Sequence, residues 1–123
     1  MARIGDFVDA SAPMAPDAPG ADALARFEAE PATLVFAVAD ADGQPVGLIE
    51  RNAFTLKLAA EFGRALYARR PVSALMDPAP MIVEADASAD VLFQSMDAAG
   101  LGALLKGFIV VSRGRYVGVG AGL

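Results

Sequence analysis

The sequence contains one glycine-bearing hairpin pattern twice, and this repeat restricts the fold more than any other feature of the chain. An apolar run at 33–39 leads into a turn at 40–43, and a second extended run follows at 44–49. The same order of strand, turn and strand returns at 107–119. Three pairs of residues match at one offset of 71 residues: Gly43 with Gly114, Val46 with Val117, and Gly47 with Gly118. The sequence therefore predicts two β-hairpins of the same kind, with Pro45 at a strand start or on an edge.

The segments that precede the two hairpins are also alike. The tripeptide Ala-Pro-Met occurs at 12–14 and again at 79–81, and the segment 4–9 parallels the segment 72–77. Several matches in the same order, at nearly constant offset, indicate a duplication. Each half is then expected to contain a short helix, a short extended segment, a helix and a hairpin. The alternative is a single α+β domain with two unrelated hairpins.

Helices are expected in both halves of the chain. The pattern predicts a helix at about 20–30 in the first half and another at about 88–99 in the second. Ser88 is suited to cap the second of these helices. A further helix is expected at about 51–60, and a helical piece near 61–68 leads into the second half.

The paired hairpins and the segment 72–81 resemble a known family. The Asp-x-Asp-Gly-x-x-Val-Gly-Leu-Ile type of motif at 40–49, behind a helix, is similar to the cystathionine-β-synthase-type (CBS) domain, and two copies resemble the CBS pair, or Bateman module. The resemblance implies an α+β (α/β-like) fold of two β-α-β-β-α units, related by a pseudo-twofold axis, with their sheets packed together and two clefts between them. The first repeat is expected at 1–60, a connecting helix and linker at 61–71, and the second repeat at 72–123.

The resemblance implies a regulatory role rather than catalysis. Such modules sense adenine nucleotides or related ligands, form homodimers and control an attached enzyme, kinase or transporter. The segments 61–72 and 107–120 look like the CBS regions of bacterial signalling proteins that carry GGDEF, EAL or histidine-kinase output domains. The expected function is therefore that of a sensory module in a larger bacterial signalling protein, with an adenine nucleotide as candidate ligand and an output domain on the C-terminal side. The alternative is a ligand-free module for dimerisation or docking.

The chain departs from the family's nucleotide signature at the end of each hairpin. Copies that bind ATP follow the second strand with Thr or Ser and, three residues later, with Asp. Here Glu50 stands in the place of the hydroxyl and Ala53 in the place of the Asp. In the second half Ala121 holds the hydroxyl position and the sequence ends at Leu123, so the closing helix is expected to be cut short and the chain to be a fragment. Because a carboxylate at Glu50 would repel a phosphate, these residues do not support nucleotide binding.

Seven residues are candidates for ligand contact: Met14, Met81, Ile82, Arg64, Arg69, Arg70 and Tyr116. If the repeat holds, the two methionines occupy equivalent positions that line the clefts. The three arginines form the strongest local positive cluster, either as an anion-binding rim of the cleft or as the solvated face of a crossing helix. The tyrosine is suited either to stack on a base or to cap the core.

Composition excludes several other classes of function. The chain has no Cys and no His, which removes disulfides, thiol chemistry and every nucleophile that needs a histidine base. The formal net charge of −5 disfavours nucleic acids as partners. The longest plain apolar run, at 108–111, is too short to cross a membrane, and no signal peptide is recognisable, so a cytoplasmic location is expected. Asp40 and Asp42 fit turn positions better than a metal site, and carboxylates are not paired at a catalytic spacing, so neither a metal nor an enzyme is expected.

Overall fold

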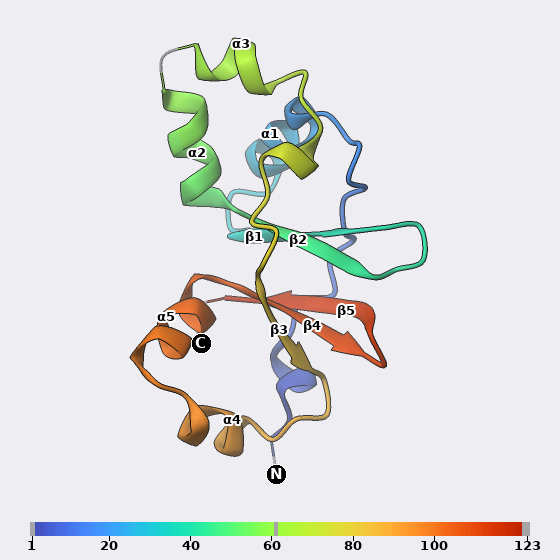
Figure 1. Ribbon diagram of the computed structural model, residues 1–123, viewed down its shortest axis with the longest axis vertical. Coiled ribbons are helices and arrows are strands. Elements are labelled where there is room, and N and C mark those ends of the chain that lie inside the picture. The colour runs from blue at the N-terminus through green and yellow to red at the C-terminus, as the bar shows by residue number, and fades with distance from the viewer. Residues whose placement is uncertain (1, 61, 122–123) are drawn as a thin grey trace.

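The computed structural model describes residues 2–60 and 62–121. Its first half contains, in chain order, η1 (Ile4–Phe7), α1 (Gly20–Ala29), β1 (Val35–Ala39), β2 (Pro45–Glu50), α2 (Arg51–Ala59) and α3 (Gly63–Tyr67), where η denotes a 3-10 helix. Its second half contains η2 (Val72–Ala74), β3 (Met81–Glu84), α4 (Ala89–Ser95), α5 (Ala98–Lys106), β4 (Phe108–Ser112) and β5 (Arg115–Gly120). Figure 1 shows the strands β1, β2, β4 and β5 in the middle of the molecule, with α1, α2 and α3 at one end and α4 and α5 at the other.

Both predicted hairpins are present in the structure. β1 pairs antiparallel with β2 and β4 pairs antiparallel with β5, and Gly47 and Gly118 each lie opposite a valine of the preceding strand. The turn residues Gly43 and Gly114 both adopt a φ of +80°, a conformation that glycine reaches without steric cost. Pro45 is the first residue of β2, as expected for a residue that cannot donate to a strand ladder.

An extended segment lies beside the first strand of each hairpin, although the two halves differ in how regular this pairing is. In the second half β3, which begins at Met81, pairs parallel with β4. In the first half Met14 makes only a single parallel bridge to β1. Its N–H donates to the carbonyl of Ala37 at 2.9 Å and its carbonyl accepts the N–H of Ala39 at 3.0 Å. Val38 lies opposite Gly47 as Val110 lies opposite Gly118, so Met14 takes the place of Val83 rather than that of Met81, and the predicted equivalence of the two methionines is wrong by two residues.

The single helix expected at 88–99 is wrong, because two helices occupy this region. Ser88 caps α4 as expected and accepts the N–H of Val91 at 3.5 Å. The carboxylate of Asp97 then accepts the N–H of Gly100 at 2.8 Å and caps the start of α5. An N-capping carboxylate inside the predicted span thus divides one helix into two.

The other expected helices are confirmed. α1, α2 and α3 lie within the predicted ranges 20–30, 51–60 and 61–68. The predicted truncation of a closing helix concerns the end of the chain, where 122–123 lie outside the described residues.

The strand β1 is buried on both faces, which explains why its sequence is a continuous apolar run. Phe36 and Val38 pack in the core of the first half, where the ring of Phe36 lies 4.3 Å from that of Phe27. Val35 and Ala37 belong instead to a cluster between the two sheets, with residues of β4 and β5. Successive side chains of a strand point to opposite faces, so one strand serves two cores.

The two halves exchange their first short helices. Ile4 in η1 is fully buried in the core of the second half, and its N–H donates to the carbonyl of Ala87 at 3.0 Å. Val72 in η2 is fully buried in the core of the first half, and its N–H donates to the carbonyl of Ala18 at 2.7 Å. Each half therefore needs a segment of the other to complete its core.

Candidate functional site

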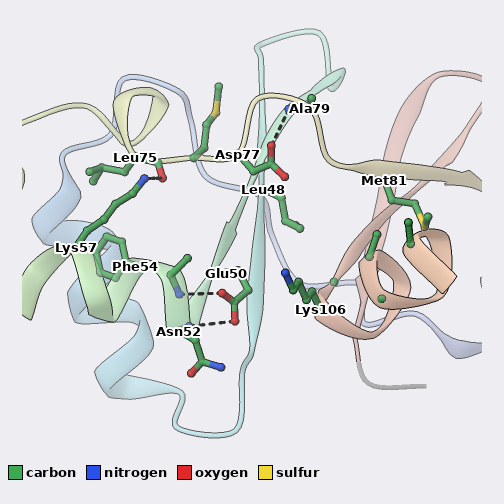
Figure 2. A pocket seen from close by; sticks show the side chains of 16 residues that line it. Leu48, Glu50, Asn52, Phe54, Lys57, Leu75, Asp77, Ala79, Met81 and Lys106 are labelled. Carbon is green, nitrogen blue, oxygen red and sulfur yellow. Dashed lines mark hydrogen bonds between the residues drawn. The ribbon is translucent and has the colours of Figure 1, made fainter.

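A cavity of about 800 Å³ lies between the two halves (Figure 2). Three regions line it: the end of β2 with the start of α2, the segment from the end of η2 to the start of β3, and α5 with the residue that follows it. The lining residues are Leu48, Glu50, Asn52, Ala53, Phe54 and Lys57 from the first region, Leu75, Met76, Asp77, Ala79 and Met81 from the second, and Ala99, Gly102, Ala103, Lys106 and Gly107 from the third. Both halves therefore contribute side chains to this cavity.

Glu50 lies directly before α2 and caps that helix with its carboxylate. Its Oε1 accepts the N–H of Asn52 at 3.1 Å and its Oε2 accepts the N–H of Ala53 at 2.8 Å. The first amides of a helix lack partners within the helix, and the helix dipole places partial positive charge there. A carboxylate at the junction of β2 and α2 therefore satisfies two of these amides at the edge of the cavity.

Two lysines and a second carboxylate add to the polar lining. Lys57 on α2 donates from Nζ to the carbonyl of Leu75 at 2.9 Å, which ties α2 to the end of η2. The carboxylate of Asp77 accepts the N–H of Ala79 at 2.9 Å. Lys106 in the last turn of α5 reaches the cavity from the side opposite Lys57 (Figure 2). The cavity can therefore hold a small molecule by charge, hydrogen bonds and apolar contact together.

A smaller cavity, of about 240 Å³, lies at the place that the repeat makes equivalent to the first. It is lined by the end of β5, where Ala121 takes the place of Glu50, and by Asp9, which matches Asp77 in the repeat. The segment 32–35 completes its described lining, which contains no basic side chain. Its size and its lining make it the weaker candidate for a ligand site.

One of the seven candidate residues from the sequence lies at the larger cavity. Met81 lines it from the start of β3. Met14 lies beside β1, and its side chain packs in the core of the first half and is only 8% exposed. Ile82 is 49% exposed on β3, outside the described lining of both cavities. Ligand contact by Met14 and Ile82 stays a prediction.

The three candidate arginines lie on the surface, in and after α3. The side chain of Arg64 is 72% exposed, and its guanidinium lies 3.9 Å from the carboxylate of Glu28. The guanidinium of Arg70 lies 6.0 Å from the ring of Tyr67, and Arg69 is exposed. In the part of the chain that the structure describes, none of the three lines either cavity. Their role in ligand binding stays a prediction.

Tyr116 on β5, the last of the seven, joins the second sheet to the N-terminal segment. Its hydroxyl donates to the carbonyl of Ser11 at 2.6 Å, and burial raises the pKa of the phenol above its ordinary value of 10.0. The folded state therefore favours the protonated phenol. The resulting stability is fully present below about pH 10 and is lost as the pH rises through the higher pKa of the folded state.

Replacing Tyr116 with phenylalanine is expected to remove this pH dependence and to cost about 1 kcal/mol at neutral pH, the typical net value of one hydrogen bond. Urea unfolding at a series of pH values on both sides of 10 measures both effects. Tyr67 is present in both proteins, so the difference between them reports on Tyr116. Equal losses of stability above pH 10 in the two proteins would contradict the assignment.

Sequence reasoning missed Lys57, Asp77 and Lys106 as cavity residues. The position of Lys106 at the cavity depends on α5. The sequence indicates this helix through Asp97 as N-cap, an apolar run, and Gly107 after the last turn. Lys57 and Asp77 have no comparable signal, because their place at the cavity depends on how the two halves pack.

Among the residues at 2–60 and 62–121, no group of three or more Asp or Glu side chains is placed so that it could hold a metal ion. No helix within these ranges is both long enough and apolar enough to cross a membrane.

Comparison with solved structures identifies the fold. No protein-family model matches the sequence, and no curated protein matches it. The CBS-domain containing protein ATU1752 from Agrobacterium tumefaciens is similar with a TM-score of 0.72 at 20% identity, over 97% of this chain and 87% of that one. The CBS-pair protein CBSX2 from Arabidopsis thaliana is similar with a TM-score of 0.76 at 19% identity, again over 97% and 87% of the two chains.

Two similar structures contain adenine-based ligands. CBSX2 in complex with AMP has a TM-score of 0.73 at 21% identity, over 97% of this chain and 89% of that one. The CBS domain pair of protein MJ0100, in complex with 5′-methylthioadenosine and S-adenosyl-L-methionine, has a TM-score of 0.71 at 16% identity, over 98% and 90%. The chain therefore has the mixed α/β fold of a CBS-domain pair with two small sheets, which confirms the predicted fold class.

Proposed function

We propose that this chain is a non-catalytic regulatory module that binds a small adenine-containing ligand in the cavity between its two halves. The carrying observation is that both halves line the cavity, the first through Glu50 and Phe54 and the second through Ala103 and Lys106. A volume of about 800 Å³ lies in the range of small-molecule sites. Bound AMP in CBSX2 and bound S-adenosyl-L-methionine in MJ0100 support an adenine-based ligand.

A mode of regulation follows from the position of the cavity between the two halves. A ligand shifts a protein's conformation only if it binds one arrangement more tightly than another. A ligand that contacts both α2 and α5 favours the spacing of the halves that suits it. Because η1 and η2 are exchanged, a change in that spacing also acts on both cores.

The proposal extends to the cellular context. The likeness of 61–72 and 107–120 to CBS regions of bacterial signalling proteins supports a sensory module within a larger cytoplasmic protein. In this proposal a GGDEF, EAL or histidine-kinase output domain lies on the C-terminal side, and the module acts as a homodimer. Ligand binding then changes how the output domains are held relative to each other.

A ligand-free dimerisation or docking module is the alternative, and exposed apolar side chains favour it. Leu56 on α2 and Phe62 before α3 are 72% and 77% exposed. Val91 on α4 and Leu105 on α5 are 62% and 54% exposed. These side chains lie on or beside helices at both ends of the molecule (Figure 1), where each offers apolar contact area to a partner. This alternative predicts that no ligand is bound and that sedimentation shows a concentration-dependent dimer.

Adenosine, AMP, 5′-methylthioadenosine and S-adenosyl-L-methionine are the ligands to test. A ligand that binds only the folded chain adds about 2.7 kcal/mol of stability at 100 times its Kd, which thermal unfolding detects. Ala103→Trp places a large side chain in the cavity and is expected to weaken binding by about tenfold or more, equal to about 1.4 kcal/mol, in isothermal titration.

Ala65→Trp is the matched control, because Ala65 lies on α3, is exposed and is outside the described cavity lining. This variant is expected to bind like the wild type. If none of the four ligands raises the Tm of the wild type or gives heat on titration, the ligand proposal fails and the docking alternative gains support.

A further inference from the structure

Glu50 caps α2 where that helix meets the cavity. Its two carboxylate oxygens already hold the N–H groups of Asn52 and Ala53, at 3.1 and 2.8 Å. These amides, at the positive end of the helix dipole, are the groups that otherwise attract an anion such as phosphate. The side chain therefore acts as an anion built into the chain, at the place where a ligand's phosphate would find its best partners.

We propose that the cavity selects a nucleoside-type ligand whose end facing Glu50 is uncharged or cationic, and that it selects against a phosphate at that end. This inference rests on the proposed function and adds the chemical class of the ligand. A phosphate beside Glu50 meets a like charge and finds two helix amides already bonded. A hydroxyl or an amine meets a hydrogen-bond acceptor instead.

Glu50 retains the capacity to bind such donors. A carboxylate has about four lone-pair positions, and the amides of Asn52 and Ala53 use two of them. The remaining positions can accept hydrogen bonds from the two hydroxyls of a ribose or from an amino group. Leu48 and Met76, which also line the cavity, offer apolar surface for a base.

The two lysines of the lining do not reverse this preference at the α2 end. Lys57 donates to the carbonyl of Leu75 at 2.9 Å and is held against the end of η2. Lys106 comes from α5 (Figure 2), and among the described residues it forms no ion pair with Glu50. Glu50 is therefore the charged side chain that bonds directly to the amides at the α2 end.

Titration of the intact chain with adenosine and with AMP tests the proposal, using the wild type, Glu50→Ser and Glu50→Gln. Serine is a good N-cap and glutamine keeps the size of the side chain, so both variants are expected to fold. Removing one negative charge near a bound phosphate is expected to raise the affinity for AMP relative to adenosine by about tenfold. Glu84→Gln is the control, because Glu84 is exposed and outside the described cavity lining.

A second measurement does not depend on an adenine ligand. Inorganic phosphate is expected to shift the amide NMR signals of Asn52 and Ala53 in Glu50→Ser and to leave them unchanged in the wild type. That result, with no binding of adenosine or AMP to any variant, supports the role of Glu50 and counts against the adenine ligand of the proposed function. If AMP binds the wild type more tightly than adenosine and Glu50→Ser does not change that ratio, the proposed function stands and the selectivity inference is overturned.

Discussion

Replacing Arg51 with alanine should lower the free energy of unfolding by about 3 kcal/mol, a large share of the roughly 5–15 kcal/mol typical of a domain. The guanidinium donates from Nε to the carbonyl of Thr33 at 2.7 Å, and from Nη2 to the carbonyls of Phe27 at 2.9 Å and Glu30 at 2.7 Å. Two of these acceptors lie at the end of α1, where carbonyls lack partners within the helix. Without the side chain, the carbonyls of Phe27 and Thr33 lose the Arg51 donor, and the carbonyl of Glu30 keeps only the N–H of Thr33, at 3.0 Å.

Two further variants show whether the forked geometry of Arg51 is the cause. Arg51→Lys keeps the charge, but a compact ammonium does not reproduce the planar fork from which Nε and Nη2 reach three carbonyls, so a loss of about 2 kcal/mol is expected. Arg64→Ala is the control, because this exposed arginine has only a surface ion pair, and its loss is expected to cost less than about 0.5 kcal/mol. Guanidinium denaturation followed by circular dichroism gives all three values. Equal stability of Arg51→Ala and Arg64→Ala would show that other donors reach these carbonyls.

The two hairpins could be predicted from the sequence because their signals are local. Gly43 and Gly114 adopt the positive φ that their turns require, and each turn lies between two short apolar runs. The helix at 88–99 could not be bounded in the same way, because its apolar pattern continues past Asp97. The capping hydrogen bond from the Gly100 N–H to the Asp97 carboxylate marks the start of a second helix there.

The exchange of short helices could not be predicted from local pattern. Ile4 and Val72 are apolar and stand at equivalent places in the repeat, so burial of both is a natural expectation. Their sequence context does not say in which core each is buried. Which core receives each short helix depends on contacts with residues far away in the sequence, such as the hydrogen bond from the Ile4 N–H to the Ala87 carbonyl.

Of the seven candidate residues Met81 alone lies in the described lining of the larger cavity, and the sequence singled out Glu50 only as a departure from the family's nucleotide signature. The repeat places Glu50 at the end of a hairpin, where the resemblance expects a ligand contact. The clearest cluster of charge in the sequence, Arg69 with Arg70, lies outside both cavities within the described residues. Residues that are close in the sequence lie along one helix or loop, whereas the residues that line this cavity come from three separate regions of the chain.

Gly107 lies where the cavity, α5 and the packing between the two sheets meet. It closes α5 by donating its N–H to the carbonyl of Ala103 at 3.1 Å, and it lines the cavity. A Cβ at this position would lie 2.5 Å from Cγ1 of Val35 and 3.4 Å from Cδ2 of Leu48. Both neighbours belong to the cluster between the sheets, so the contact joins the second half to the first.

Gly107→Ala is therefore expected to lower the free energy of unfolding by about 3 kcal/mol, through a strained φ and a steric clash that act together. The φ of +149° is one that a residue with a Cβ rarely adopts, and Val35 can relieve the clash only by moving within the packed cluster between the sheets. Urea denaturation measures the loss. The variant is also expected to lower the affinity of the cavity for any ligand, because Leu48 and Gly107 both line it.

Gly102→Ala provides the matched control for this prediction. Gly102 lies within α5 and also lines the cavity, but a Cβ there would meet no atom within 4 Å. Because alanine is the better helix former, this variant is expected to be more stable than the wild type by about 0.5–1 kcal/mol. The same substitution on one helix and at its end should thus change stability in opposite directions. If Gly107→Ala is as stable as Gly102→Ala, the end of α5 does not hold the two halves in register, and the spacing across the cavity is set elsewhere.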